Sequence, residues 1–190
     1  MKKKLAIFAS GSGTNFEALV TACENGQIDA EVSLLVCDKK NAYVIKRAEN
    51  HNVPAFILNP KDYASKEEYE ELIVEKLVEN NVDLICLAGY MRIIGYVLLR
   101  KYEGKIINIH PALLPSFKGA HGIVDAYNYG VKVFGVTIHY VDSGIDSGKI
   151  IAQRAFEYED GDTLSDVERK IHEIEHELYP EVVAKLVKGE

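Results

Sequence analysis

The chain has few cysteines, and none of them lies in a metal-binding pattern. Cys23, Cys37 and Cys86 are the only three among 190 residues, and each lies within an apolar run. No CxxC or CxxH spacing is present, so structural zinc is not expected. Scattered thiols of this kind are typical of reduced core cysteines. We therefore predict a cytoplasmic protein.

Long apolar runs are also missing. No segment approaches the roughly 20 apolar residues that a membrane-spanning helix needs. The first residues, MKKKLAIFAS, are basic and then apolar, as in an export signal. Their apolar run from Leu5 to Ala9 is too short for such a signal, because Gly11 and Gly13 break the pattern directly after it. We expect no association with a membrane.

Basic residues are outnumbered, since 22 Lys and Arg against 29 Asp and Glu give a net charge of -7. This balance disfavours general binding to nucleic acids. A small anionic ligand could still be bound by local donors. Internal repeats, low-complexity segments and linkers are not apparent, and 47% of the residues are apolar. We expect a single domain over residues 1–190 with a substantial core.

Short continuous apolar runs alternate with amphipathic helical stretches along the chain. Strands that are apolar throughout predict a mostly parallel sheet covered by helices on both faces, a three-layer Rossmann-like α/β fold. Two T/S-x-x-E capping boxes, Thr14 with Glu17 and Ser65 with Glu68, predict helix starts. Strands are expected at 5–10, 32–38, 53–58, 82–90, 105–110, 134–141 and 148–158, and helices at 14–25, 42–50, 65–80, 95–102, 124–129 and 163–188.

A glycine-rich loop comes after the first predicted strand. Ligands of open α/β sheets bind beyond the carboxyl ends of the strands, so this position is favourable for a site. Gly11 and Gly13 let the backbone approach an anion, and the helix from Thr14 directs its free amides and dipole at it. Phe16 replaces the third glycine of G-x-G-x-x-G, and no P-loop lysine is present. The segment is either a site for a simple phosphate monoester or a tight strand-to-helix turn.

Two polar residues end the fifth predicted strand. Asn108 and His110 are two apart, so they face the same side of a strand. An Asn amide can donate to an oxyanion, and His is the usual general acid at neutral pH. The alternative is a core histidine whose ring is satisfied by the backbone. Pro111 and Pro115 then end the strand, because proline lacks an amide donor and fixes φ.

A second glycine-rich loop, Asp142 to Gly148, comes after the strand expected at 134–141. It resembles a calcium loop, but Gly144, Ser147 and Gln153 stand where such a loop needs other residues. Asp146 could instead face His110, where a carboxylate would favour the charged ring and fix its tautomer. The alternative is a solvated turn with two aspartates.

Two further segments are ambiguous when taken alone. The residues Gly89 to Ile94 after the fourth strand either line a pocket for a flat ring or form an ordinary surface turn around Arg92. His172 to His176 matches H-E-x-x-H, the zinc protease signature. No third protein ligand is apparent near it, and Glu-rich helices often produce this match, so zinc is disfavoured.

Taken together, these segments resemble the folate-dependent phosphoribosylglycinamide formyltransferases, along essentially the whole chain. Each is weak alone, but their order and spacing are specific. The matching segments are Gly11–Asn15, Leu87–Ile93, Asn108–Pro115, Gly119–His121, Asp142–Gly148 and Glu175–His176 before Tyr179-Pro180.

The resemblance implies roles for individual residues. The cosubstrate would be 10-formyltetrahydrofolate and the acceptor the amine of glycinamide ribonucleotide, with no metal and no covalent enzyme intermediate. Asn108, His110 and Asp146 would be the catalytic residues, and His121 is a possible further site residue. Gly13, Thr14, Asn15, His172, Glu173, Ile174 and Glu175 would bind the ribonucleotide. Lys66, Met91, Arg92, Ile93, Ile94, Asn108, Asp142, Ser143, Gly144, Ile145 and Asp146 would bind the folate.

The family resemblance also implies which half of the chain binds which substrate, and the sequence departs from the family pattern at two places. The amino-terminal half would bind the phosphorylated substrate, and the carboxyl-terminal half would bind folate and carry the catalytic loop. Lys66 stands where many members have Arg, which keeps the charge but loses the bidentate fork. The segment Gly122 to Asp125 lacks a second His or Arg common there. We expect a monomer or homodimer.

Three alternatives stay open at this point. Methionyl-tRNA formyltransferases share part of the pattern but carry a basic carboxyl-terminal domain, which this acidic chain is not expected to have. Formyltetrahydrofolate deformylases share the catalytic residues and have an amino-terminal regulatory domain, which is also not expected here. A non-catalytic module for a phosphorylated ligand requires His110 and Asp146 to lie apart.

Overall fold

The computed structural model describes all residues, 1–190, and forms one sheet with helices on both faces. This confirms the predicted α/β fold with a mostly parallel sheet. None of the helices combines the length and the apolar character that a membrane span requires. The strands are β1 (Lys3–Ala9), β2 (Ala30–Cys37), β3 (Ala55–Ile57), β4 (Leu84–Leu87), β5 (Ile106–His110), β6 (Val133–Tyr140) and β7 (Ile150–Glu157), and the helices α1 (Thr14–Glu24), α2 (Val44–Asn50), α3 (Lys66–Glu79), α4 (Tyr96–Lys101), α5 (Gly122–Tyr129) and α6 (Leu164–Lys188).

The seven strands lie in the order β3-β2-β1-β4-β5-β6-β7. The strands β1 to β5 pair in parallel, whereas β6 is antiparallel to both β5 and β7. The chain first builds outward from β1 to β3 and then returns to place β4 on the other side of β1. Where the direction of strand addition reverses, between β1 and β4, a crevice is left at the carboxyl ends of these two central strands.

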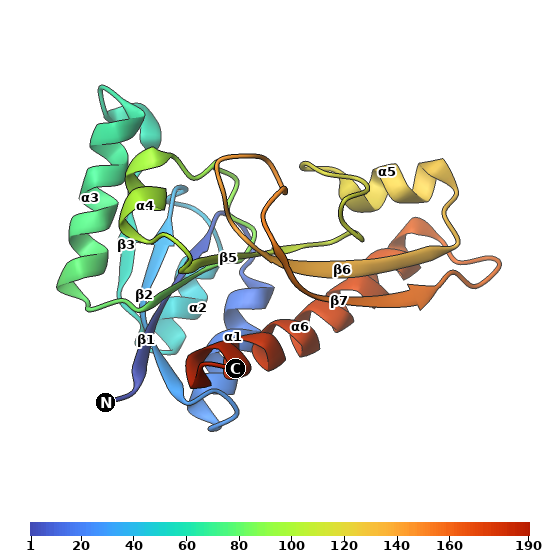
Figure 1. The fold of residues 1–190 in the computed structure, drawn as a ribbon, viewed down its shortest axis with the longest axis horizontal. Helices are drawn as coiled ribbons and strands as arrows, with labels where there is room; N and C mark the ends of the chain where they lie inside the picture. The colour runs from blue at the N-terminus through green and yellow to red at the C-terminus, as the bar shows by residue number, and fades with distance from the viewer.

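The core has two parts, one on each face of the sheet. The larger part packs α1, α2 and α6 against one face, and the smaller packs α3 and α4 against the other (Figure 1). In β5, Ile107 and Ile109 belong to the larger part and Ile106 to the smaller. Alternation along β5 therefore anchors the strand in the core and turns Asn108 and His110 away from the larger part.

Strand β4 is shorter than the sequence predicts. The apolar pattern predicted a strand over 82–90, but β4 ends at Leu87. Gly89 has φ +77°, a left-handed conformation that ends the extended chain. The residues after Leu87 therefore turn away from the sheet and toward the crevice.

The predicted capping box at Thr14 and Glu17 is wrong. Gly13, with φ +77°, occupies the N-cap of α1, and no side chain caps the helix. Thr14 is already the first helical residue, so its hydroxyl lies one position too late. At α3 only half of the predicted capping box forms. The Ser65 hydroxyl accepts from the amide of Glu68, as expected, but the Glu68 carboxylate accepts from the amide of Ala64 and not from that of Ser65.

Candidate active site

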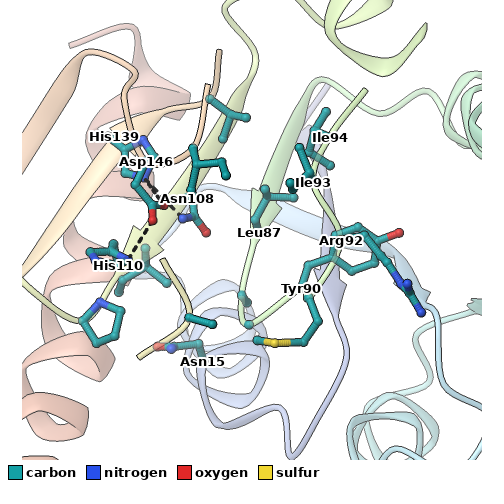
Figure 2. Close-up of a pocket in the computed structure, with 18 of the residues that line it drawn as sticks. Asn15, Leu87, Tyr90, Arg92, Ile93, Ile94, Asn108, His110, His139 and Asp146 are labelled. Carbon is teal, nitrogen blue, oxygen red and sulfur yellow. Dashed lines mark hydrogen bonds and ion pairs between the residues drawn. The ribbon is translucent and has the colours of Figure 1, made fainter. Parts of the chain in front are cut away.

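A cavity of about 590 Å³ opens at the carboxyl ends of β1, β4 and β5. The loop after β1, the turn after β4, the end of β5, the loop between β6 and β7 and one face of α6 contribute to its wall (Figure 2). Most residues predicted for a site line it. These are Gly13, Thr14, Asn15, Met91, Arg92, Ile93, Ile94, Asn108, His110, Asp142, Gly144, Ile145, Asp146, His172 and Glu175.

His110 and Asp146 lie together, as predicted. Oδ2 of Asp146 is 3.5 Å from Nδ1 of His110, whose side chain is only 4% exposed. The other ring nitrogen, Nε2, is 2.8 Å from the carbonyl oxygen of Phe117. Both ring nitrogens thus face oxygen acceptors, and an imidazolium ring could donate to both.

The Asp146 carboxylate is held by three groups. Besides His110, the amide of Gly119 donates to Oδ2 at 2.8 Å, and Nε2 of His139 lies 3.7 Å from Oδ1. The neighbouring His139 ring lowers the pKa of Asp146 most strongly, with smaller contributions from the Gly119 amide and the charge of His110, while burial opposes them. Asp146 is therefore a carboxylate at neutral pH.

His139 is a site residue that the sequence did not indicate. It faces Asn108 across the antiparallel pair β5–β6, and Nδ2 of Asn108 lies 3.3 Å from its Nε2. Figure 2 shows the three side chains of His139, Asp146 and Asn108 grouped beside His110. The signal in the sequence was a lone histidine in an otherwise buried strand. Its partner could not be found without the register of β6 on β5.

The glycine-rich loop leads into α1 without a side-chain cap, so the first amides of the helix are left for a ligand. Asn15 donates from Nδ2 to Glu175 of α6 at 3.1 Å, and Glu175 also contacts Nδ1 of His172 at 2.6 Å. The hydrogen bond to Glu175 raises the pKa of His172. The free amides at the start of α1 form an anion-attracting corner of the cavity, and the Glu175 carboxylate between Asn15 and His172 adjoins it.

Another part of the cavity lining is apolar, and hydrogen bonds fix the turn that carries much of it. Met91, Ile93 and Ile145 are each more than half exposed, although they line the cavity. The turn that carries Met91 and Ile93 is fixed at several points. The hydroxyl groups of Tyr90 and Tyr69 are hydrogen-bonded at 2.7 Å, and the amide of Met91 donates to Ser10 Oγ. Arg92 pairs with the buried Asp38 at 2.9 Å, and the amide of Gly95 donates to Glu70 at 2.7 Å. Apolar side chains on a fixed backbone suit a flat aromatic ligand.

Five predicted site residues do not line the cavity. Glu173 pairs with Arg169 on the exposed side of α6, and Ile174 packs against the core. Consecutive helical residues point about 100° apart, so only His172 and Glu175 of that turn reach the cavity. The residues outside the wall are Lys66, His121, Ser143, Glu173 and Ile174.

The H-E-x-x-H match forms no metal centre. The rings of His172 and His176 stack with centroids 6.4 Å apart. No group of three His, Cys, Asp or Glu side chains is placed to hold a metal ion. Glu175 occupies one of the two variable positions of the zinc protease pattern. Its carboxylate instead accepts a hydrogen bond from Asn15 in the first turn of α1.

The fold and site define a class of protein: an α/β domain whose crevice joins an anion-binding loop, an apolar wall and a His–Asp pair. The sequence model of formyl transferases matches residues 3–183. The phosphoribosylglycinamide formyltransferase of Bacillus subtilis (strain 168) is 52% identical over 185 residues, covering 97% of this chain and 95% of that protein. The chain belongs to the formyl transferase family.

Solved structures give the same result. The glycinamide ribonucleotide transformylase 1 of Geobacillus kaustophilus superposes with a TM-score of 0.96 at 53% identity, covering 98% of this chain and 100% of that one. A further relative, found by sequence and not as a solved structure, is the trifunctional purine biosynthetic protein adenosine-3 of Gallus gallus. It is 39% identical over 99% of this chain, which spans 19% of that protein.

Proposed function

We propose that this chain transfers the formyl group of 10-formyltetrahydrofolate to the amine of glycinamide ribonucleotide, giving the N-formyl product and tetrahydrofolate in purine biosynthesis. The observation that supports this most is the buried contact of 3.5 Å between His110 and Asp146 in the wall of the cavity. A phosphate-binding module without chemistry would have no use for a held His–Asp pair at that point.

The two ends of the cavity suit the two substrates. The amides of Gly13, Thr14 and Asn15 would hold the ribonucleotide phosphate, and His172 and Glu175 would contact its glycinamide part. The apolar wall with Met91, Ile93 and Ile145 would hold the pteridine ring, and the backbone from Arg92 to Ile94 could supply its hydrogen-bonding groups. The cavity thus draws on both halves of the chain, since Asn15 and Glu175 bond directly.

The chemistry begins with attack of the glycinamide amine on the formyl carbon, which forms a tetrahedral oxyanion. Asn108 would donate to this oxyanion from Nδ2, which has a second hydrogen besides the one facing His139. His110 would donate from Nε2, exchanging the Phe117 carbonyl for the oxyanion. Each such donor contributes on the order of 3 kcal/mol to the stability of the transition state.

Asp146 would stabilise the imidazolium form of His110 throughout. Its lowered pKa keeps it ionised, so its negative charge faces Nδ1 while Nε2 works on the substrate. The attacking amine carries an extra proton in the tetrahedral intermediate, and transfer of this proton to N10 of the folate would allow the bond between the formyl carbon and N10 to break. The carbonyl then re-forms, which releases tetrahydrofolate and the formylated amide. We further infer that the enzyme acts in the cytoplasm as a monomer or homodimer, without nucleic acid.

One assay separates transfer from hydrolysis. The purified protein is mixed with 10-formyltetrahydrofolate, and release of tetrahydrofolate is followed with and without glycinamide ribonucleotide. Release that requires the ribonucleotide supports the proposal. Release at the same rate without it would support a deformylase, and no release in either mixture would contradict both.

A further inference from the structure

Helix α2 forms the support of the glycine-rich loop. The amide of Val44 donates to the carbonyl of Gly11 at 3.1 Å, and Nε of Arg47 donates to the carbonyl of Ser12 at 2.7 Å. A methyl group added to Gly13 would collide with the Val44 side chain. The loop thus rests directly on α2, and Arg47 provides a charged contact between α2 and the loop backbone.

The guanidinium of Arg47 is itself fixed. Its Nη1 lies 3.4 Å from the carboxylate of Glu17 on α1, and Cζ, the central carbon of the guanidinium, lies 5.0 Å from the centre of the Tyr43 ring. The other oxygen of Glu17 contacts His51 at 2.8 Å, and His51 also contacts Glu24 at 2.8 Å. Arg47 is therefore held between α1 and α2, and its side chain is 24% exposed.

Arg47 lies behind the loop and not in the cavity wall. Its bond draws the carbonyl oxygen of Ser12 toward α2, and so away from the place where an anion would lie. A carbonyl facing an anion repels it, whereas successive amides facing the same way form an anion-binding nest. The same bond places a positive charge behind the nest, partly offset by Glu17.

We propose that Arg47 is a positioning residue for the substrate phosphate: by bonding the Ser12 carbonyl while anchored to Glu17, it holds the glycine-rich loop in the conformation that presents its amides to the phosphate. This inference rests on the proposed function for the identity of the substrate. It adds a residue that does not touch the ligand and that no motif in the sequence indicated.

The Arg47→Lys variant is the critical test. Lysine keeps the positive charge but lacks the planar fork, so it cannot bond the Ser12 carbonyl and Glu17 with the same geometry. We expect the KM for glycinamide ribonucleotide to rise about tenfold, as loss of one charged hydrogen bond predicts. The KM for 10-formyltetrahydrofolate and the kcat at saturation should stay close to wild type. Arg47→Gln, which also removes the charge, should raise the KM further.

Arg100→Lys is the matched control, because Arg100 is exposed at the end of α4, away from the loop. It should leave both KM values unchanged. The dephosphorylated substrate, glycinamide riboside, gives a second control. If Arg47 acts through the phosphate, wild type and Arg47→Lys should process the riboside equally poorly.

Binding of ribose 5-phosphate, measured by calorimetry, separates this inference from the proposed function. It involves no formyl transfer, so weaker binding by Arg47→Lys would support the role of Arg47 even if the transfer assay failed. Three results would overturn the proposal: wild-type affinity of Arg47→Lys for the phosphorylated ligands, an equal loss for riboside and ribonucleotide, or an equal loss for the folate. Thermal unfolding of each variant checks that the comparison is made on folded protein.

Discussion

The carboxylate of Asp146 lies 3.5 Å from Nδ1 of His110, although one belongs to the loop after β6 and the other ends β5. The antiparallel pairing of β5 with β6 brings the two segments together, and the left-handed conformation of Asp146, φ +49°, turns its side chain toward the ring. This contact removes the main support for a purely ligand-binding module, which required the two residues to lie apart.

Asp146→Asn should reduce kcat by about a hundredfold to ten-thousandfold, the usual range for a group that supports acid–base chemistry. The amide keeps the size of the side chain but loses the charge that stabilises the imidazolium form of His110. Binding of both substrates should change little, which equilibrium titration can check. A variant with wild-type kcat would contradict the role assigned to Asp146.

His139→Phe should shift the acidic limb of the kcat–pH profile to higher pH. The neighbouring His139 ring is the largest cause of the lowered pKa of Asp146, so its loss moves that pKa up toward the ordinary value of 3.8, while the Gly119 amide and the charge of His110 still oppose the effect of burial. Asp146 then becomes protonated, and activity is lost, at a pH where the wild type is still active. An unshifted limb would mean that His139 has only a packing role.

Gly13→Ala should destabilise the fold and weaken binding of the ribonucleotide. A left-handed conformation costs a residue with a side chain about 1–2 kcal/mol, and the collision with Val44 adds to this cost. Gly26→Ala is the matched control, since Gly26 has φ +84° with open space around it. Urea unfolding should show a larger loss for Gly13→Ala, and equal losses would show that the contact with Val44 is unimportant.

The contact of His51 with two carboxylates predicts a pH-dependent contribution to stability. The hydrogen bond to Glu17 is the main cause of its raised pKa, with Glu24 also contributing. A group whose pKa is raised on folding stabilises the protein fully below its unfolded value, here 6.5, and loses that contribution as pH rises through the folded value.

His51→Gln should therefore be less stable than wild type at a pH below 6.5, and the difference should shrink at an alkaline pH, above the raised pKa of the ring. Urea unfolding at both pH values provides the measurement. A difference that does not change with pH would show that the ring contributes by packing alone. Lys46→Gln, on the exposed side of the same helix, serves as the control.

The order of strands and helices could be predicted because each element carries its own pattern. Continuous apolar runs are typical of buried strands, and β1, β2 and β5 were found close to their predicted bounds. Strand β4 was overestimated because its apolar pattern continues past Leu87, while Gly89 alone redirects the chain. The antiparallel direction of β6 and β7 depends on how the chain crosses the sheet, which no local pattern encodes.

The site was predictable where the residue types themselves suggested chemistry. Asn108, His110 and Asp146 lie at or after the ends of strands and carry groups that are unusual there. His139 was missed because its role depends on the register that places it opposite Asn108. Arg47 was missed because an arginine in an amphipathic helix is ordinarily a surface residue, and only the packing of α2 under the loop gives it a partner. Long-range contacts of this kind are set by the tertiary fold.

An isotope-labelled formyl group provides the decisive test of formyl transfer between the two substrates and of the part that His110 plays in it. The protein is mixed with 10-formyltetrahydrofolate labelled at the formyl carbon and with glycinamide ribonucleotide, and the products are separated and analysed by mass spectrometry. We predict that the label appears in the N-formyl ribonucleotide, and that His110→Ala abolishes its appearance. Label recovered only as formate, or transfer that continues at the wild-type rate in His110→Ala, would contradict the proposed function and the role of His110.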